Sequence, residues 1–185
     1  MSTEQLEKFQ DELVIPEGVT VTQQKNMLTF VGPLGKTHKS FRLIPVKIEI
    51  AGNKILLKTI NFKKSDYSIL HTAKSIIRNI CEGLITGYTI KMKIVFAHFP
   101  ITLKVDGKNI IIENFQGERA VRKTMVVGNT KVIPKGEDVI LTGAVWTDIT
   151  QTAANIELKT RVKNKDHRVF LDGIYSFEKK KGIEK

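Results

Sequence analysis

The order of apolar and polar residues predicts β-strands in the first third of the chain. From Val19 onward the two kinds of residue alternate with a period of two, as they do when successive side chains point to opposite faces of a sheet. Strand-like segments are VTVTQ (19–23), MLTFV (27–31), VKIEI (46–50) and KILLKTI (54–60). GPLG (32–35) and residues 51–53 supply turns, so we expect antiparallel hairpins.

The period then changes to that of a helix. After Ser65 and Asp66, which can cap a helix N-terminus, the apolar residues form one stripe: Ile69, Leu70, Ala73, Ile76, Ile77, Ile80, Cys81 and Leu84. The spacing predicts a helix over residues 65–84, ended by Gly83 and Gly87. We expect it to bury Ile69, Ala73, Ile76, Ile80 and Leu84 against the sheet of its own half.

The second half repeats this order. Strand-like segments are YTIKMKIVFAHF (88–99), ITLKV (101–105), KNIIIEN (108–114), RKTMVV (122–127) and DVILTGAVW (138–146), whereas GNTKVIPKGEDV (128–139) has the composition of a loop. Asp106-Gly107 is a hairpin turn. Asp148 is expected to cap a second helix that has Ile149, Ala153, Ile156 and Thr160 on one side.

Two long segments resemble each other across the halves. KNMLTFVGPLGKTHKSF (25–41) and KNIIIENFQGERAVRKT (108–124) both begin with Lys-Asn, continue with an apolar run, reach a glycine and end in basic residues. A period of 80–90 residues exceeds that of solenoid repeats and favours duplication of a whole domain. We therefore predict an α+β protein of two tandem duplicated domains, each an antiparallel or mixed β-sheet packed against one α-helix. The domains are residues 1–87, with an acidic N-terminal lead, and residues 88–185, with a basic C-terminal tail.

Charge points to a polyanionic partner. The chain has 30 Lys and Arg against 19 Asp and Glu, a net charge of +11, and a pI near 9.7. Such a surplus is typical of proteins that bind nucleic acid. Residues 1–18 carry −4, residues 19–93 carry +10, residues 94–158 balance, and residues 159–185 carry +5. Positive charge therefore gathers on the first half and on the C-terminal segment.

The residues give no sign of catalysis. His38, His71, His98 and His167 lack metal-ligand spacing, Cys81 is the only cysteine, and neither GxSxG nor a P-loop occurs. We therefore expect no enzyme activity, no metal, no cofactor and no small-molecule substrate. The N-terminus lacks the pattern of a signal peptide and no apolar run approaches a membrane span, which favours a cytosolic or nuclear protein without a membrane partner.

The candidate RNA-binding residues lie mainly in the C-terminal segment, 159–181. Lys and Arg can neutralise phosphates, and Asn, His and Tyr can add hydrogen bonds or stacking. We expect Lys163, Lys165 and Arg168 on phosphates, with Phe170, Leu171 and Tyr175 pinning the segment to the second domain; the alternatives are a frayed tail, or an RNA face on the basic first domain. The full set is Lys159, Arg161, Lys163, Asn164, Lys165, His167, Arg168, Tyr175, Lys179 and Lys180, assisted by Arg119, Arg122 and Lys123.

Several long motifs resemble one known family. GYTIKMKIVFAHFPI, IENFQGERAVRKT and VKNKDHRVFLDGIY, together with IPEGVTV and LTFVGPLGK near the N-terminus, are similar to the large-subunit ribosomal protein of the universal family numbered six, called number nine in eukaryotes. The resemblance covers about residues 13–178, and the AHFPI and KNKD…FLDGIY forms resemble the eukaryotic members.

This resemblance implies two similar α+β domains and a structural, non-catalytic role in the large ribosomal subunit. It also implies docking, mainly through the C-terminal domain, on ribosomal RNA near the sarcin–ricin loop and the stalk base. Neighbouring large-subunit proteins and translational GTPases are expected there. The protein would be cytoplasmic, in ribosomes, and assembled through the nucleolus in a eukaryote. A free regulatory RNA-binding protein is the alternative, although no RNA-binding module with exposed stacking aromatics is visible.

Overall fold

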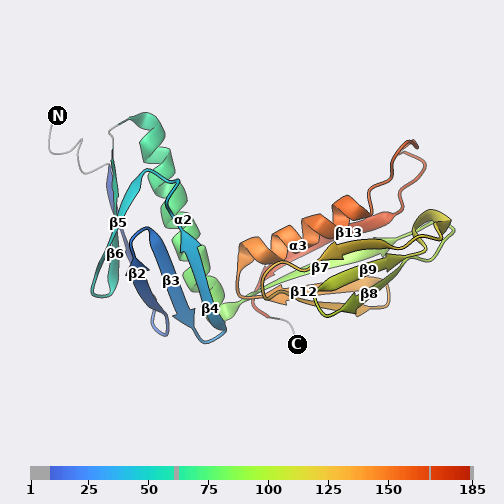
Figure 1. Cartoon of the computed structure of the whole chain (residues 1–185), viewed down its shortest axis with the longest axis horizontal. Coiled ribbons are helices and arrows are strands. Elements are labelled where there is room, and N and C mark those ends of the chain that lie inside the picture. The colour runs from blue at the N-terminus through green and yellow to red at the C-terminus, as the bar shows by residue number, and fades with distance from the viewer. Residues whose placement is uncertain (1–8, 61–62, 167, 184–185) are drawn as a thin grey trace. The chain divides into compact units, whose positions relative to one another are not determined.

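The computed structural model describes residues 9–60, 63–166 and 168–183. The chain folds as two compact units, Met1–Ile85 and Thr86–Lys185. Each unit combines antiparallel sheets with one long helix, so the predicted α+β class is confirmed (Figure 1).

Unit 1 contains two three-stranded sheets. Strands β1 (Gln10–Val14), β6 (Lys54–Thr59) and β5 (Val46–Ala51) form one, in the order β1-β6-β5. Strands β2 (Thr20–Gln24), β3 (Met27–Gly32) and β4 (Gly35–Ser40) form the other as a meander. Buried residues alternate along them, with Leu28 and Phe30 on β3 and Ile55 and Leu57 on β6, because one face of each sheet packs into the core.

Helix α2 (Lys64–Thr86) covers this core and is longer than its periodicity predicts. It runs through Gly83, which is buried, and ends before Gly87, whose φ of 71° suits a left-handed C-terminal position. At its start the Asp66 carboxylate accepts a hydrogen bond from the Lys63 backbone N–H at 3.2 Å, which is one half of a capping box.

The burial predicted for α2 is partly wrong. Ala73, Ile80 and Leu84 are buried as expected, but Ile69 and Ile76 are only half-buried. Leu70 and Ile77 are fully buried in their place. The core-facing stripe is therefore rotated by one residue toward Leu70 and Ile77, which leaves Ile69 and Ile76 at its margin.

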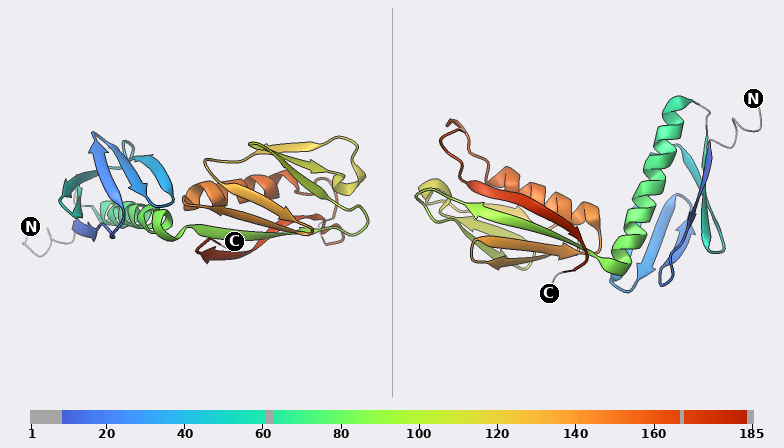
Figure 2. Two further views of the ribbon diagram at one scale, coloured as in Figure 1. Left: turned by 90° about the horizontal axis from the view of Figure 1, so that it is seen from below. Right: turned by 180° about the vertical axis from the view of Figure 1, so that it is seen from behind.

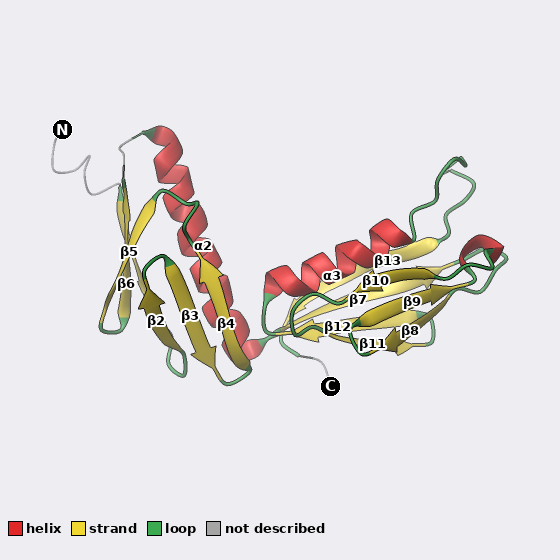
Figure 3. Cartoon of the chain, viewed as in Figure 1, coloured by secondary structure: helices red, strands yellow, loops and turns green. Residues whose placement is uncertain are grey.

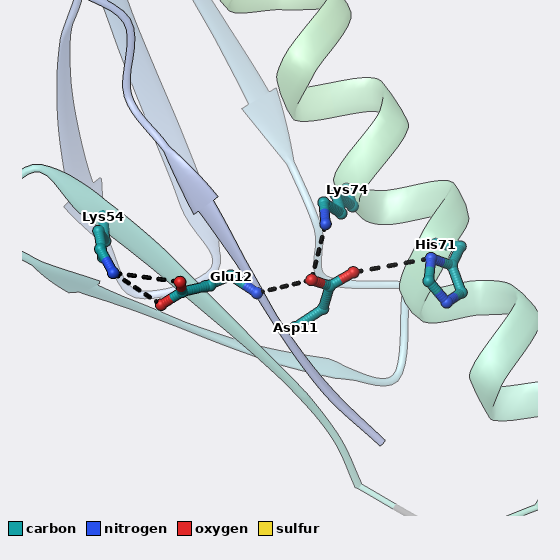
Figure 4. Close-up of polar contacts among 5 residues, drawn as sticks. All are labelled: Asp11, Glu12, Lys54, His71 and Lys74. Carbon is teal, nitrogen blue, oxygen red and sulfur yellow. Dashed lines mark hydrogen bonds and ion pairs between the residues drawn. The ribbon is translucent and has the colours of Figure 1, made fainter. Parts of the chain in front are cut away.

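Polar contacts tie the first strand to this helix (Figure 4). The Asp11 carboxylate on β1 lies 2.7 Å from the Lys74 Nζ and 3.7 Å from the His71 Nδ1, both on α2. The next residue, Glu12, pairs with Lys54 Nζ on β6 at 3.1 Å. The two carboxylates thus anchor β1 on both sides, and they belong to the acidic stretch read from the sequence.

Unit 2 contains a four-stranded and a three-stranded sheet. Strands β11 (Lys131–Lys135), β12 (Asp138–Gly143), β7 (Tyr88–Val95) and β13 (Gly173–Lys181) form the larger sheet, in that order. Strands β10 (Arg122–Met125), β9 (Asn109–Glu113) and β8 (Thr102–Asp106) form the smaller sheet, in that order. A short 3-10 turn, η1 (Phe115–Gly117), follows β9. Buried residues from both sheets and the helix, among them Ile90, Ile112, Leu141 and Ile149, form the core of unit 2.

Helix α3 (Trp146–Lys159) buries Ile149, Thr152, Ala153 and Ile156. The cap predicted at Asp148 is wrong, because the helix begins two residues earlier and Val145 occupies the N-cap without a side-chain hydrogen bond. The preceding strand β12 accordingly ends at Gly143 and does not reach Trp146. Trp146 instead makes an edge contact with Tyr88, with ring centroids 5.0 Å apart.

The two units repeat one strand order. Strands β5-β6-β1 of unit 1 correspond to β11-β12-β7 of unit 2, the meander β2-β3-β4 corresponds to β8-β9-β10, and α2 corresponds to α3. The repeated sequence segments therefore fall on equivalent central strands, β3 and β9. The two Lys-Asn pairs are not at equivalent positions. Lys25 is structurally equivalent to Gly107, the residue before Lys108, because each is the left-handed first residue of its hairpin turn.

Unit 2 adds a strand to this plan. Within the described residues β13 has no counterpart in unit 1, and it pairs with β7 along nearly its whole length (Figure 2). The frayed-tail alternative for the C-terminal segment is thereby excluded for residues 173–181. Strand β4, where the sequence predicts no strand, and strand β11, where it predicts a loop, are also present; β11 tolerates Pro134 because it lies at a sheet edge.

Candidate nucleic-acid interface

The candidate site centres on the connection between α3 and β13, whose described residues, 160–166 and 168–172, project past the end of the helix (Figure 3). Its two ends are fixed by buried polar groups. The Thr160 hydroxyl accepts a hydrogen bond from the Ile174 backbone N–H at 3.1 Å. The buried Asp172 carboxylate accepts one from the Ala97 N–H at 2.9 Å and one from the Gln116 side chain at 3.4 Å. Both ends of the loop that carries the basic residues are therefore fixed by hydrogen bonds.

The outer part of the loop is organised around Asp166. Its carboxylate forms an ion pair with Arg168 at 3.0 Å, and its backbone carbonyl accepts hydrogen bonds from Val169 and Phe170. The Asp166 hydrogen bond raises the pKa of the Arg168 guanidinium. Lys165 Nζ lies 4.7 Å from the centre of the Phe170 ring, a cation–π contact. Lys165 and Arg168 are both exposed. Each nevertheless already interacts with a neighbour in the loop.

The apolar residues expected to pin this segment do so less than predicted. Leu171 is 60% exposed and Phe170, Tyr175 and Phe177 are also exposed, whereas Ile174 is fully buried. The segment is held instead by Ile174, by the Thr160 and Asp172 hydrogen bonds and by backbone pairing of β13 with β7. These exposed side chains, together with exposed Val169, are therefore left on the surface beside the basic residues.

Arg122 has a structural role. Its Nη1 donates to the Lys159 backbone carbonyl at 2.6 Å, while Nε and Nη2 donate to the two Glu118 carboxylate oxygens at 2.8 and 2.6 Å. The guanidinium carbon also lies 4.0 Å from the centre of the Phe115 ring. The hydrogen bond from Arg122 lowers the pKa of the Glu118 carboxyl. All three guanidinium nitrogens of Arg122 are therefore engaged by the protein.

This arrangement brings three lysines together at a hollow of about 340 Å³. Lys123 comes from β10, Lys159 from the end of α3 and Lys163 from the loop, so three separate segments converge there. Each of the three side chains is exposed, and none forms an ion pair with another described residue. Val121 and Leu158 complete the walls. A cluster of unneutralised ammonium groups around a hollow is suited to bind phosphate.

A second hollow, of about 490 Å³, lies between α3 and β13 and shares Leu158 with the first. Tyr175 and Arg161 are both exposed in its lining. The Tyr175 ring lies against Gly173, where a Cβ atom would come within 2.6 Å of it, so only glycine permits this ring position. The Tyr175 hydroxyl also donates to the Asp172 carbonyl at 3.4 Å. The aromatic face is thus held in place beside an exposed guanidinium.

The remaining candidates do not join this group. Lys179 and Lys180 lie on β13 opposite Ile90 and Thr89, at the other end of the strand from Gly173. At about 3.3 Å per residue, six or seven residues of strand separate them from the loop by roughly 20 Å. Arg119 is exposed in the turn before β10, and Asn164 adopts a left-handed φ of 58° in the loop. His167 lies outside the described residues.

Sequence reasoning missed Leu158 and Val121, which are 63% and 45% exposed at the hollows. A signal for Leu158 was present. It follows Ile149 by nine residues, which places it about 180° around the helix from the buried stripe at 3.6 residues per turn. A leucine on the outer face of an otherwise polar helix points to a contact surface.

Among the described residues, no three His, Cys, Asp or Glu side chains are grouped so that they could hold a metal ion. Neither described helix combines the length and apolar character required to cross a bilayer.

Comparison with known proteins identifies the family. No family model matches the chain. It is 42% identical to the large ribosomal subunit protein uL6 of Methanobrevibacter smithii over 171 residues, which cover 92% of this chain and 96% of that protein. It is 43% identical to uL6 of Methanocella arvoryzae over 165 residues (89% and 93%) and 38% identical to uL6 of Aeropyrum pernix over 170 residues (91% and 93%). These relatives are archaeal, so the likeness to eukaryotic members stays a prediction. With such identity over nine-tenths of its length, and with the duplicated fold that the resemblance implied, the chain belongs to the uL6 family of structural, non-enzymatic proteins of the large ribosomal subunit.

Proposed function

We propose that the protein binds large-subunit ribosomal RNA through a basic face on unit 2, formed by Lys123, Lys159, Arg161 and Lys163. The observation that carries this proposal is the convergence of Lys123, Lys159 and Lys163 from three segments on one hollow. Ammonium groups held close together repel one another, and an RNA phosphate relieves that repulsion when it binds between them.

Tyr175 and Leu158 extend the basic face with apolar surface. A base that leaves the RNA stack can lie on the Tyr175 ring, while Arg161 contacts the adjoining phosphate. Because Gly173 and Asp172 hold the ring in place, little conformational freedom is lost when a base stacks on it. Lys165, Arg168 and Asn164 add contacts from the loop, and Lys179 and Lys180 act separately, at the far end of β13.

The resemblance to the family supports a proposed location within the ribosome. We propose that the basic face docks near the sarcin–ricin loop and the stalk base, among neighbouring large-subunit proteins and close to the site of translational GTPases. In this arrangement the domain of residues 88–185 anchors the protein on RNA, and the domain of residues 1–87 carries the acidic lead. The protein would reside in cytoplasmic ribosomes, with assembly through the nucleolus in a eukaryote.

The experiment compares two triple-alanine variants of the same unit. Changing Lys123, Lys159 and Lys163 to alanine should sharply lower the fraction of the protein that sediments with large subunits. The control changes Lys108, Lys131 and Lys135, which are exposed lysines of unit 2 away from the hollow. Both variants should fold, because exposed charges add little to stability.

Binding of the purified protein to large-subunit RNA gives the second measurement. The basic-face variant should lose roughly two to three units from the slope of log K against log salt, since each of the three lost phosphate contacts contributes about 0.7 to 0.9 to that slope. The control variant should keep the slope. Equal incorporation of the two variants, or a mostly ribosome-free pool of the native protein, would contradict the proposal.

A further inference from the structure

Unit 1 carries an exposed apolar residue, Leu43, at the turn between β4 and β5. Leu43 is 95% exposed there, the most exposed of the large apolar residues described. The turn is well defined: the Ile44 N–H donates to the Phe41 carbonyl at 3.0 Å, and the Phe41 N–H donates to the Asn26 carbonyl at 2.8 Å. Leu43 is therefore presented to solvent by an ordered turn that is hydrogen-bonded to the β2–β3 connection.

Leu43 stands at a hollow of about 640 Å³, larger than either hollow on unit 2. Ile44, Pro45 and Ile60 add apolar surface to its walls. The Gln23 side chain donates to the Lys25 carbonyl at 3.0 Å and to the Ile48 carbonyl at 2.8 Å, so it joins the two sides of the hollow. We name this feature the Leu43 groove; its walls are held in place before any partner binds.

The rim of the Leu43 groove is positively charged. Lys25, Arg42 and Lys47 are exposed in its lining, and none forms an ion pair with another described residue. Glu49 is the one acidic side chain among the lining residues that the structure describes. Lys25 adopts a left-handed φ of 55°, an uncommon conformation for a residue with a side chain.

We propose that the Leu43 groove binds a protein segment in which acidic residues flank an apolar side chain. The partner's apolar side chain would pack against Leu43 and Ile60, and its carboxylates would pair with Arg42 and Lys47. Arg42 can hold a carboxylate through two parallel hydrogen bonds, which adds direction to the charge attraction. The opposite charges also raise the association rate.

The apolar content distinguishes this partner from RNA. Contacts to a phosphate backbone need cations and N–H donors, and a base needs an exposed ring to stack on; Phe41, the one aromatic residue among the described lining residues, is buried. Burying Leu43 against an apolar side chain, in contrast, removes surface from water at about 25 cal/mol per Å². The combination of an exposed leucine and free cations therefore favours a peptide that is both apolar and acidic. Binding of such a peptide also gives the +10 charge of residues 19–93 a role separate from the basic face of unit 2.

The test measures binding of a short fluorescein-labelled peptide of Asp and Glu residues with a central Leu-Phe pair, by fluorescence anisotropy with the full chain. Leu43→Ser should raise the Kd about tenfold, as expected when an interface anchor is truncated. The pair Arg42→Glu and Lys47→Glu should raise it at least as much. A matched pair, Lys36→Glu and Lys64→Glu, reverses the same charge elsewhere on unit 1 and should change the Kd about twofold or less.

Three further probes complete the test. A peptide with Ser-Ser in place of Leu-Phe should bind at least tenfold more weakly, and a single-stranded RNA of equal charge should not displace the labelled peptide. The proposal is overturned if both charge-reversal pairs weaken binding equally, if the Ser-Ser peptide binds as well, or if the RNA displaces the peptide. A cross-linker at position 43 in assembled large subunits should then label an acidic protein segment; labelling of RNA alone would also overturn it.

Discussion

The side chain of Arg122, a candidate RNA contact, joins three parts of unit 2. Its guanidinium closes the C-terminal end of α3 by donating to the Lys159 carbonyl, which has no partner within the helix. It also joins the turn at Glu118 to the ring of Phe115. By holding Lys159 and β10 together, it positions two of the three lysines of the basic face.

Replacing Arg122 by alanine should therefore lower the free energy of unfolding of unit 2 by about 2–3 kcal/mol, since charge-assisted hydrogen bonds and a cation–π contact are lost together. Arg122→Lys should restore little, because an ammonium cannot reproduce the two-pronged contact with Glu118. Urea denaturation followed by Trp146 fluorescence measures the effect. A stability unchanged in Arg122→Ala would contradict this role.

Glu118→Gln provides a pH-dependent control. The pKa of the Glu118 carboxyl is lowered in the folded protein, mainly by the Arg122 hydrogen bond. Its stabilisation is therefore fully present above the ordinary glutamate pKa and is lost as pH falls through the lowered value. The difference in unfolding free energy between the native protein and Glu118→Gln should be about 1 kcal/mol at pH 7 and should shrink toward zero in acid.

The density of charge in the sequence identified the basic segment. It could not show which of its residues are used by the fold and which stay available to RNA. Arg119, Arg122 and Lys123 lie within five positions, yet only Arg122 is taken up by Glu118, Phe115 and Lys159. Those partners depend on how η1 folds, with left-handed φ values at Asn114 and Gln116 that no local pattern announces. Lys179 and Lys180 look contiguous with the loop, but strand pairing carries them away from it.

At the scale of elements, Gly32 determines how closely β3 approaches α2. A Cβ atom at this position would lie 2.8 Å from the Leu84 Cβ and 3.3 Å from the Leu84 carbonyl oxygen. That same carbonyl accepts a hydrogen bond from the Leu34 N–H at 3.1 Å. The strand end and the last turns of the helix are therefore joined by backbone contact, which any side chain would separate.

Gly32→Ala should lower the free energy of unfolding of unit 1 by about 1–3 kcal/mol, the usual cost of forcing extra atoms into a packed region. The φ of Gly32 is not in the left-handed region, so the clash itself is the cause. Thr29→Ala on the same strand is the control and should cost less than about 1 kcal/mol. Chemical denaturation of both variants measures the difference; equal effects would argue against a close approach at Gly32.

Elements with a clear period were predictable, and polar edge strands were not. The stripe of α2 and the apolar runs of β3, β7 and β9 follow directly from burial on one face. Strand β4 has the sequence GKTHKS, β11 contains Pro134, and β13 ends in three lysines. Each lies at the edge of its sheet, where backbone pairing on one side forms the strand without an apolar pattern.

At the scale of the molecule, each unit carries its own natural reporter. Cys81, the only cysteine, is buried in the core of unit 1, and Trp146, the only tryptophan, begins α3 of unit 2. Burial, and to a lesser degree the Glu82 carboxylate, raises the pKa of the Cys81 thiol to about 11. At pH 8 the folded protein therefore holds an enclosed, protonated thiol, and labelling requires unit 1 to unfold.

Because each unit has a separate core, a change in one should move only its own reporter. Gly32→Ala should lower the urea midpoint of Cys81 labelling and leave the midpoint of Trp146 fluorescence unchanged. Arg122→Ala should do the reverse. Midpoints that always shift together would show that the two units unfold as one cooperative body.

The pairing of β13 with β7 has a consequence for synthesis. The Gly182 N–H donates to the Gly87 carbonyl at 2.9 Å, so the first and last strands of unit 2 lie side by side although most of the unit separates them in sequence. A nascent chain leaves the ribosome N-terminus first. Unit 1 can close once α2 has emerged, whereas β7 keeps an open edge, bearing Ile90, Met92 and Ile94, until β13 has also emerged. A prematurely terminated chain would display that edge permanently, and it would be recognisable to chaperones and proteases as an unfinished protein.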